Sequence, residues 1–200
     1  MEQSFLERHP WIKDAAGLFL FVLAVIIGTI LINTYVFRSF NVEGPSMETT
    51  LSTGDRLIVN RLPVTWAQLQ NKQYVPERGQ IIVFKNPLYT VGSTDEYIVK
   101  RVIGLPGERV QLKDGHFTVY NDNQPDGFDP DDNNDGEPGS PTAGTPKEIV
   151  VPDATLYVAG DHREGNYSFD SRNGLGFVPL YDVVGPVSAR ILPVTDIRGF

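Results

Sequence analysis

A serine and a lysine far apart in the chain are the residues best suited to nucleophilic chemistry. Ser46 follows Gly44 and Pro45, a pair typical of a tight turn that would expose the serine hydroxyl. Lys100 lies in the apolar run 97–103, whose composition is typical of a β-strand. A serine hydroxyl becomes a good nucleophile only when a neighbouring base takes its proton. The sequence thus offers a nucleophile and a candidate base.

Lys100 can act as that base only if its pKa is lowered. An unperturbed lysine has a pKa of about 10.4 and is protonated at neutral pH. Lowering the pKa by about two to three units takes roughly 3–4 kcal/mol, which removal from water can supply. In a strand, Ile98 and Val102 share the face of Lys100, so its surroundings are apolar. Arg101 has apolar neighbours on the other face, but a guanidinium cannot deprotonate and is excluded as the base.

A histidine is the alternative base. The chain has three histidines, and only His162 has a neighbour, Asp161, that could orient its ring. A triad of Ser46, His162 and Asp161 is therefore an alternative. Adjacent Asp and His residues rarely reach the geometry in which the carboxylate orients the imidazole, so the sequence favours Lys100.

An uncharged apolar stretch, residues 15–37, precedes the candidate serine by only a few positions. As a helix it would be about 34 Å long, enough to cross the roughly 30 Å of hydrocarbon in a bilayer. A core helix would be shorter and amphipathic, and a cleaved leader would have a shorter apolar region followed by a small-residue cleavage site. The stretch is followed by Arg38-Ser39-Phe40, so we expect a retained membrane anchor.

The charges around the anchor predict its orientation. Arg8 and Lys13 precede the stretch and Arg38 follows it, which favours a cytoplasmic N-terminus. We expect residues 1–14 to be cytoplasmic and residues 38–200 to form an extracytoplasmic domain on a single-pass anchor.

Beyond Arg38 the sequence is a series of short β-like runs separated by Gly and Pro. A short helix is expected at 65–71, and no long segment has a helical period. The fold class is therefore mainly β, a barrel or a sandwich behind one transmembrane helix. The predicted strands are 56–60, 80–84, 96–103, 109–113, 116–120, 148–151, 155–159 and 183–191.

An acidic segment, residues 121–147, interrupts this pattern. It has seven acidic residues and one basic residue, a net charge of −6 within a chain of −8. A solvated loop inserted in the β domain is the favoured interpretation. The alternative is a calcium loop, because Asp131, Asn133, Asp135 and Gly136 have the spacing of its first half, although its twelfth position would be Thr142.

Composition excludes several classes of protein. The chain has no cysteine, so disulfides, thiolate metal sites and cysteine nucleophiles are excluded. Its net charge of −8 argues against a nucleic-acid partner, which would require a basic surface. We expect no cofactor and no metal.

Taken together, the segments resemble the type I signal peptidases, which are membrane-anchored Ser-Lys proteases. Four motifs follow the anchor in the order expected of that family and cover nearly all of the chain outside the acidic segment. They are Phe40–Leu51, Gly54–Asn60, Gly79–Phe84 with Tyr97–Gly107, and Gly160–Arg163 with Ser168–Arg172 and Gly176–Pro179.

The resemblance implies a fold and a role for each motif residue. The fold would be the β-rich catalytic fold shared by signal peptidases and self-cleaving repressor proteases. Ser46 would be the nucleophile and Lys100 the general base. Ser168 would hydrogen-bond and orient the Lys100 amine, and Asp170 and Arg172 would pair to support that loop.

The chain also differs from the family pattern. A second oxyanion donor, which some members place two residues before the serine, would be at Gly44 and is unassigned. Thr49 replaces a proline, Gln80 an aspartate and His162 an asparagine. The spacing from Gly160 to Asp170 is two residues longer than usual.

The implied activity is removal of N-terminal signal peptides from exported pre-proteins at the plasma membrane. Substrates would bind as an added β-strand with small residues at positions −1 and −3, the Ala-x-Ala preference. One alternative is a non-catalytic, membrane-tethered β domain that binds an extracytoplasmic partner. Another is a self-cleaving repressor, which the apolar span and the lack of a visible DNA-binding module disfavour.

Overall fold

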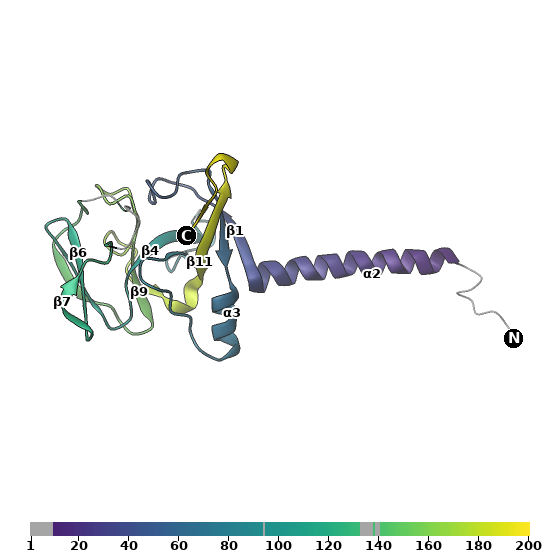
Figure 1. The fold of residues 1–200 in the computed structure, drawn as a ribbon, viewed down its shortest axis with the longest axis horizontal. Coiled ribbons are helices and arrows are strands. Elements are labelled where there is room, and N and C mark those ends of the chain that lie inside the picture. Colours follow the sequence, from purple (N-terminus) through teal and green to yellow (C-terminus); the bar gives the residue numbers. More distant parts are fainter. Residues whose placement is uncertain (1–9, 94, 133–137, 139–140) are drawn as a thin grey trace.

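A long apolar helix stands away from the β-rich remainder of the chain (Figure 1). This computed structural model describes residues 10–93, 95–132, 138 and 141–200. Helix α2, Pro10–Leu31, continues through the π-helical turn η1, Ile32–Val36, directly into strand β1, Phe37–Asn41. The span Lys13–Val36 contains an 18-residue window with a mean hydropathy of 2.8, and none of that window is buried. Within the described ranges this is the one helix long and apolar enough to cross a membrane.

The larger sheet is antiparallel and holds eight strands. Its order is β1-β2-β11-β3-β4-β9-β10, with β12 paired to β11. The strand bounds after β1 are Arg56–Asn60 for β2, Ile81–Lys85 for β3, Tyr97–Gly104 for β4, Thr155–Ala159 for β9, Val178–Pro179 for β10, Val183–Leu192 for β11 and Arg198–Gly199 for β12.

The smaller sheet has four antiparallel strands in the order β7-β6-β5-β8. It lies at the end of the domain away from α2 (Figure 1). Three short helices complete the described elements. The bounds are Arg109–Lys113 for β5, His116–Asn121 for β6, Gln124–Phe128 for β7, Lys147–Val150 for β8, Leu62–Leu69 for α3, Leu180–Asp182 for η2 and Val194–Asp196 for η3.

The sequence-predicted fold class, mainly β with one N-terminal apolar helix, is confirmed. All eight predicted strands are present with bounds within one residue of those expected. Helix α3 begins three residues earlier than predicted, at Leu62, because Pro63 occupies a first-turn position where its missing N–H costs nothing. The Leu62 N–H is bound by Asn60 Oδ1, at 3.0 Å. Phe37, which was assigned to the anchor, already belongs to β1.

A strand also forms where the acidic segment was expected to be a loop. Asn121 Oδ1 accepts hydrogen bonds from the N–H groups of Asn123 and Gln124, which closes a tight turn after β6. Strand β7 then pairs with β6, and Phe128 packs against the core of the smaller sheet. Pairing and packing across the sheet thus order a sequence whose local composition favours a loop.

Further along the acidic segment, Asp131 has a structural role. Its carboxylate accepts hydrogen bonds from both terminal nitrogens of Arg163, at 2.8 and 2.9 Å, and the Arg163 side chain is fully buried. Asp131 was one of the four residues in the calcium-loop pattern. The other three, Asn133, Asp135 and Gly136, lie outside the described residues.

Three buried hydrophobic clusters support the two sheets. The first lies beneath the loop that carries Ser46, and it takes in Met47 and Leu51 of that loop, both fully buried. The second fills the centre of the larger sheet around Ile82, Phe84 and Val102. The third joins the sheets. The position of the Ser46 loop therefore depends on core packing rather than on the loop alone.

Gly104, at the end of β4, is the tightest point of the third cluster. A Cβ atom here would lie 2.5 Å from Val110 Cγ2 and 3.0 Å from Val151 Cγ2, and both valines are buried. We predict that Gly104→Ala lowers the free energy of unfolding by about 1–3 kcal/mol through overpacking. The measurement is denaturant unfolding in detergent. Gly199→Ala is the control, because its Cβ would only touch Ser188 O at 3.8 Å. Equal effects of the two changes would contradict this account.

Candidate active site

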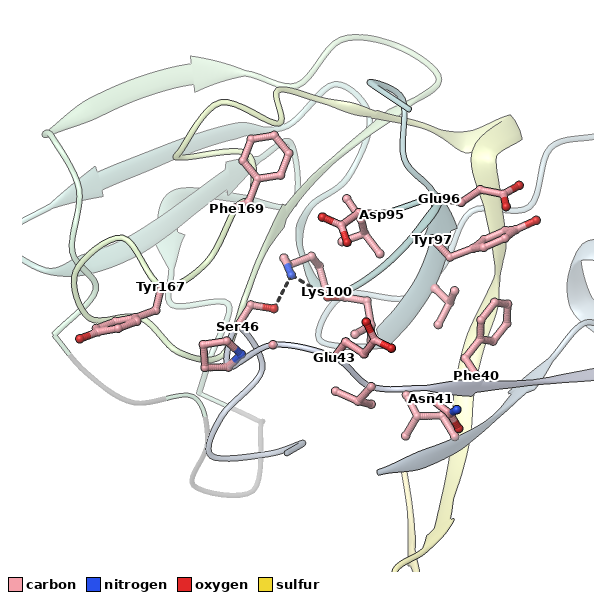
Figure 2. Close-up of a pocket in the computed structure, with 17 residues that line it drawn as sticks. Phe40, Asn41, Glu43, Ser46, Asp95, Glu96, Tyr97, Lys100, Tyr167 and Phe169 are labelled. Carbon is pink, nitrogen blue, oxygen red and sulfur yellow. Dashed lines mark hydrogen bonds between the residues drawn. The ribbon is translucent and has the colours of Figure 1, made fainter. Parts of the chain in front are cut away.

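The side chains of Ser46 and Lys100 meet in the structure. Lys100 Nζ lies 2.7 Å from Ser46 Oγ, within hydrogen-bonding distance, and it also donates to Val99 O at 2.9 Å. Figure 2 shows the pair at the centre of a groove. The Lys100 residue is only 3% exposed. A nucleophile and a candidate base are therefore in direct contact.

The Ser46 turn is closed by hydrogen bonds at its base. Val42 N–H donates to Asp55 O, and Gly54 N–H donates to Val42 O, so the two ends of the loop are paired. Gly44 adopts φ +86°, a conformation that disfavours any residue with a side chain. The turn presents the serine at its tip while Met47 is held in the core.

Burial is the main influence on Lys100. Removal from water lowers the pKa of Lys100 from 10.5 to about 8. The carboxylates of Asp170 and Asp161 oppose this shift, and the guanidinium of Arg172 adds to it. Above pH 8 most of the lysine is therefore neutral and able to accept a proton from Ser46.

Arg101, on the opposite face of β4, has a different partner. Its guanidinium donates two hydrogen bonds to Asp161, at 2.8 and 2.5 Å, and a third to Gly79 O. Asp161 is completely buried, and His162 Nδ1 lies 3.1 Å from Pro45 O. Because the carboxylate binds an arginine instead of the imidazole, the alternative Ser-His-Asp triad is not formed.

Ser168, Asp170 and Arg172 form a connected group behind the lysine. The Ser168 hydroxyl donates to Asp170 Oδ2 at 2.6 Å, and Arg172 pairs with the same carboxylate at 2.7 Å. Burial alone would raise the pKa of Asp170, but the hydrogen bonds and charge of Arg172, together with Ser168 and the Gly160 N–H, hold this pKa below its usual value. The Ser168 hydroxyl donates to Asp170, and its bond to Lys100 stays a prediction.

Gly160 is a site residue whose role the sequence did not reveal. A Cβ atom on it would lie 2.2 Å from both Ser168 Oγ and Ser46 O. The N–H of His162, two residues on, donates to Ser46 O at 3.1 Å. The chain just after β9 therefore runs directly against the Ser46 turn. Only a glycine permits this approach, and the contact joins segments more than a hundred residues apart.

A groove of about 480 Å³ surrounds the Ser-Lys pair. One wall is β1 with the chain that follows it, and the other is the start of β4. Leu57 and Val83 form an apolar floor. The lining residues are Phe40–Ser46, Leu57, Val83, Asp95–Lys100, Tyr167 and Phe169. Of these, the sequence identified only the region of Ser46 and Lys100, because the remainder come together through sheet topology.

This arrangement suits acyl transfer. The Ser46 N–H makes no hydrogen bond to another part of the described chain, and it is available to an oxyanion. Within the same described residues, no three His, Asp or Glu side chains are grouped as a metal site. The chemistry available at the groove is thus that of a serine nucleophile and a lysine base.

Comparisons with known proteins identify a family. The sequence model described as "Signal peptidase, peptidase S26" matches residues 12–192. "Signal peptidase I" of Bacillus licheniformis is 33% identical over 188 residues, covering 91% of this chain and 92% of the relative. "Probable signal peptidase I-2" of Synechocystis is 35% identical over 175 residues, covering 86% and 71%. A crystal structure of a signal peptidase I from Enterococcus faecalis, 26% identical, covers 56% of this chain and 96% of its own, with a TM-score of 0.41.

The buried lysine has a measurable cost to stability. We predict that Lys100→Met raises the free energy of unfolding at pH 7 by about 2–3 kcal/mol, because a charge held in an apolar site is replaced by a side chain of similar shape. Between the folded pKa of about 8 and the unfolded value of 10.5, the unfolded wild-type chain binds more protons than the folded one. Wild-type stability therefore rises with pH in this window, and the advantage of the variant shrinks.

The measurement is denaturant unfolding in detergent at several pH values. Lys113→Met is the control, because Lys113 is exposed at the end of β5. A loss of stability in Lys100→Met at pH 7 would show that the lysine is not held charged at a cost.

Proposed function

Because this chain belongs to the signal peptidase family, peptidase S26, we propose that it is a membrane-anchored serine endopeptidase that removes N-terminal signal peptides from exported pre-proteins. The observation that carries the proposal is the 2.7 Å contact between Lys100 Nζ and Ser46 Oγ in an open groove. The same contact favours an enzyme over the alternative of a non-catalytic, tethered binding domain.

The mechanism begins with proton transfer from Ser46 to neutral Lys100. The serine oxygen attacks the scissile carbonyl carbon, and the Ser46 N–H donates to the oxyanion that forms. Collapse of this intermediate breaks the peptide bond, and the Lys100 ammonium returns its proton to the leaving amine. The acyl-enzyme is then hydrolysed by a water that Lys100 deprotonates, which restores the serine.

The groove supports binding of the substrate as an extended strand. Its two walls are residues 40–46, at the end of β1 and just after it, and residues 95–100, just before β4 and at its start; β1 and β4 are not paired with each other. A peptide lying between them could hydrogen-bond to both backbones. Its side chains would meet the floor at Leu57 and Val83, where small residues at positions −1 and −3 fit best. We propose the Ala-x-Ala preference on this basis.

We propose that the apolar helix, α2 continued by η1, spans the plasma membrane once as an anchor that ends at Val36, where β1 follows. Residues 1–14 would be cytoplasmic and residues 38–200 extracytoplasmic. The segment 121–147 would be an acidic insertion in that domain.

The position of helix α3 supports the proposal that the β domain lies at the bilayer surface. It runs across the axis of α2 beside the end of the anchor (Figure 1). Thr65 Oγ1 donates to Tyr35 O, and Arg61 N–H donates to Val36 O, each at 2.8 Å, so the first turn of α3 is joined to η1 at the end of α2. The exposed apolar side chains of α3 are Leu62, Trp66 and Leu69. Tryptophan at such a position is typical of the membrane interface.

Removal of either reacting group tests the mechanism. Ser46→Ala and Lys100→Met are each expected to lower kcat/KM for a pre-protein at least about a thousandfold, because nucleophile and base act together. Lys100→Arg is expected to be equally inactive, since a guanidinium stays protonated. Ser52→Ala, at an exposed serine in the same loop, is the control and keeps its activity. Processing by Ser46→Ala would contradict the proposal.

The protonation state of Lys100 should also make kcat/KM depend on pH. Because neutral Lys100 is the active form and its pKa is about 8, log kcat/KM should fall with unit slope as pH drops below 8 and level off above it. The measurement is kcat/KM of the reconstituted protein from pH 6 to 10. A flat profile through pH 8 would rule out this lysine as the base.

Trp66 should be in contact with lipid. The chain has two tryptophans, so Trp11→Phe leaves Trp66 as the sole indole. In reconstituted vesicles, lipids brominated near the headgroup end of the acyl chains should quench its fluorescence. His116→Trp, in a background lacking both native tryptophans, is the control at the far end of the domain, on β6 (Figure 1). Equal quenching of the two would oppose the proposed orientation.

A further inference from the structure

Two exposed aromatic side chains lie on the opposite side of the Ser-Lys pair from the β1 wall. Figure 2 shows Tyr167 and Phe169 to the left of and above Ser46 and Lys100, whereas Phe40 and Tyr97 lie to the right. Tyr167 is 60% exposed and Phe169 is 46% exposed, and both line the groove. Nothing in the mechanism above uses them.

The chain that carries these aromatics alternates in burial from residue 167 to residue 170. Ser168 and Asp170 point inward and are 1% and 0% exposed, so Tyr167 and Phe169 must point outward. The inward residues are fixed by the ion pair of Asp170 with Arg172. The exposed aromatics therefore stand on a rigid base, although the segment lies outside the strands of the sheet.

His162 ties Tyr167 to the nucleophile turn. The two rings are stacked, with centroids 4.4 Å apart and planes inclined by 22°. His162 Nδ1 donates to Pro45 O at 3.1 Å, and the His162 backbone N–H donates to Ser46 O. A carbonyl can only accept, so the bond to Pro45 requires the proton on Nδ1. Tyr167 is thus placed relative to the serine through one intervening ring.

We propose that Tyr167 and Phe169 form a subsite for the first residues of the mature chain, after the scissile bond, and that His162 is its positioning residue. The inference rests on the proposed function, in which the signal-peptide residues occupy the walls at 40–46 and 95–100. A strand that enters there and passes Ser46 leaves the groove over the two aromatics. Their exposed faces select apolar or aromatic side chains among the first three mature residues.

The test uses one pre-protein with Ser, Leu or Phe placed in turn at positions +1, +2 and +3. The wild-type protein should cleave the Phe or Leu substrate with a kcat/KM about five- to tenfold above that of the Ser substrate at one or more of these positions. In Tyr167→Ser and Phe169→Ser this ratio should fall toward one, mainly through KM. Tyr181→Ser, at an exposed tyrosine outside the groove lining, is the matched control and keeps the ratio.

Two variants of His162 distinguish the effect of its stacking on Tyr167 from a general effect on folding. His162→Phe keeps a ring under Tyr167 and should keep the preference, while His162→Ala removes the ring and should lose it. A merely structural role would lower cleavage of all substrates alike and leave the ratio unchanged, which would overturn the positioning role.

The outcomes also distinguish this subsite from the activity on which it rests. Cleavage with a wild-type ratio near one at all three positions, or a ratio unchanged in both serine variants, would overturn the subsite alone. Absence of cleavage with every substrate would overturn the proposed function and the subsite together.

Discussion

The site depends on keeping one lysine out of water without letting nearby carboxylates hold it protonated. Asp161 and Asp170 both lie close enough to raise the pKa of Lys100. Each is bound by its own arginine, Asp161 by Arg101 and Asp170 by Arg172. The carboxylates can then organise the backbone around the site while much of their charge is balanced. Because these two ion pairs offset the carboxylate charges, the lowering of the Lys100 pKa by burial outweighs the raising of that pKa by Asp161 and Asp170.

Three segments remote in sequence must converge for this balance to exist. The turn after β1 brings the serine, the middle of β4 brings the lysine, and the chain after β9 brings the supporting carboxylate. Their meeting point is Gly160, whose missing side chain lets the last segment touch Ser46 O. The buried Met47 fixes the first segment from below. The site therefore forms together with the core of the larger sheet.

Local pattern was enough to predict the apolar helix, eight strands and the two residues, Ser46 and Lys100, whose side chains meet, because each depends on short-range periodicity or on intrinsic chemistry. Periodicity alone did not distinguish Lys100 from Arg101, and the acid-base properties of the two side chains did. Strand β7 was missed because pairing with β6 and packing of Phe128 stabilise it against an unfavourable composition. The Arg101–Asp161 pair and the aromatic side of the groove were missed for a related reason: each depends on contacts between distant segments, which a single sequence does not display.

The uninterrupted passage from α2 through η1 into β1 has a mechanical consequence. No flexible linker separates the helix from the strand that becomes a wall of the groove. If the helix spans the bilayer as proposed, the height of the serine above the lipid is a fixed length, set by a few residues of regular backbone. The distance between the serine and the membrane surface would then help to select which peptide bond is cut. A signal peptide of the wrong length would present its cleavage site too close to the membrane or too far from it.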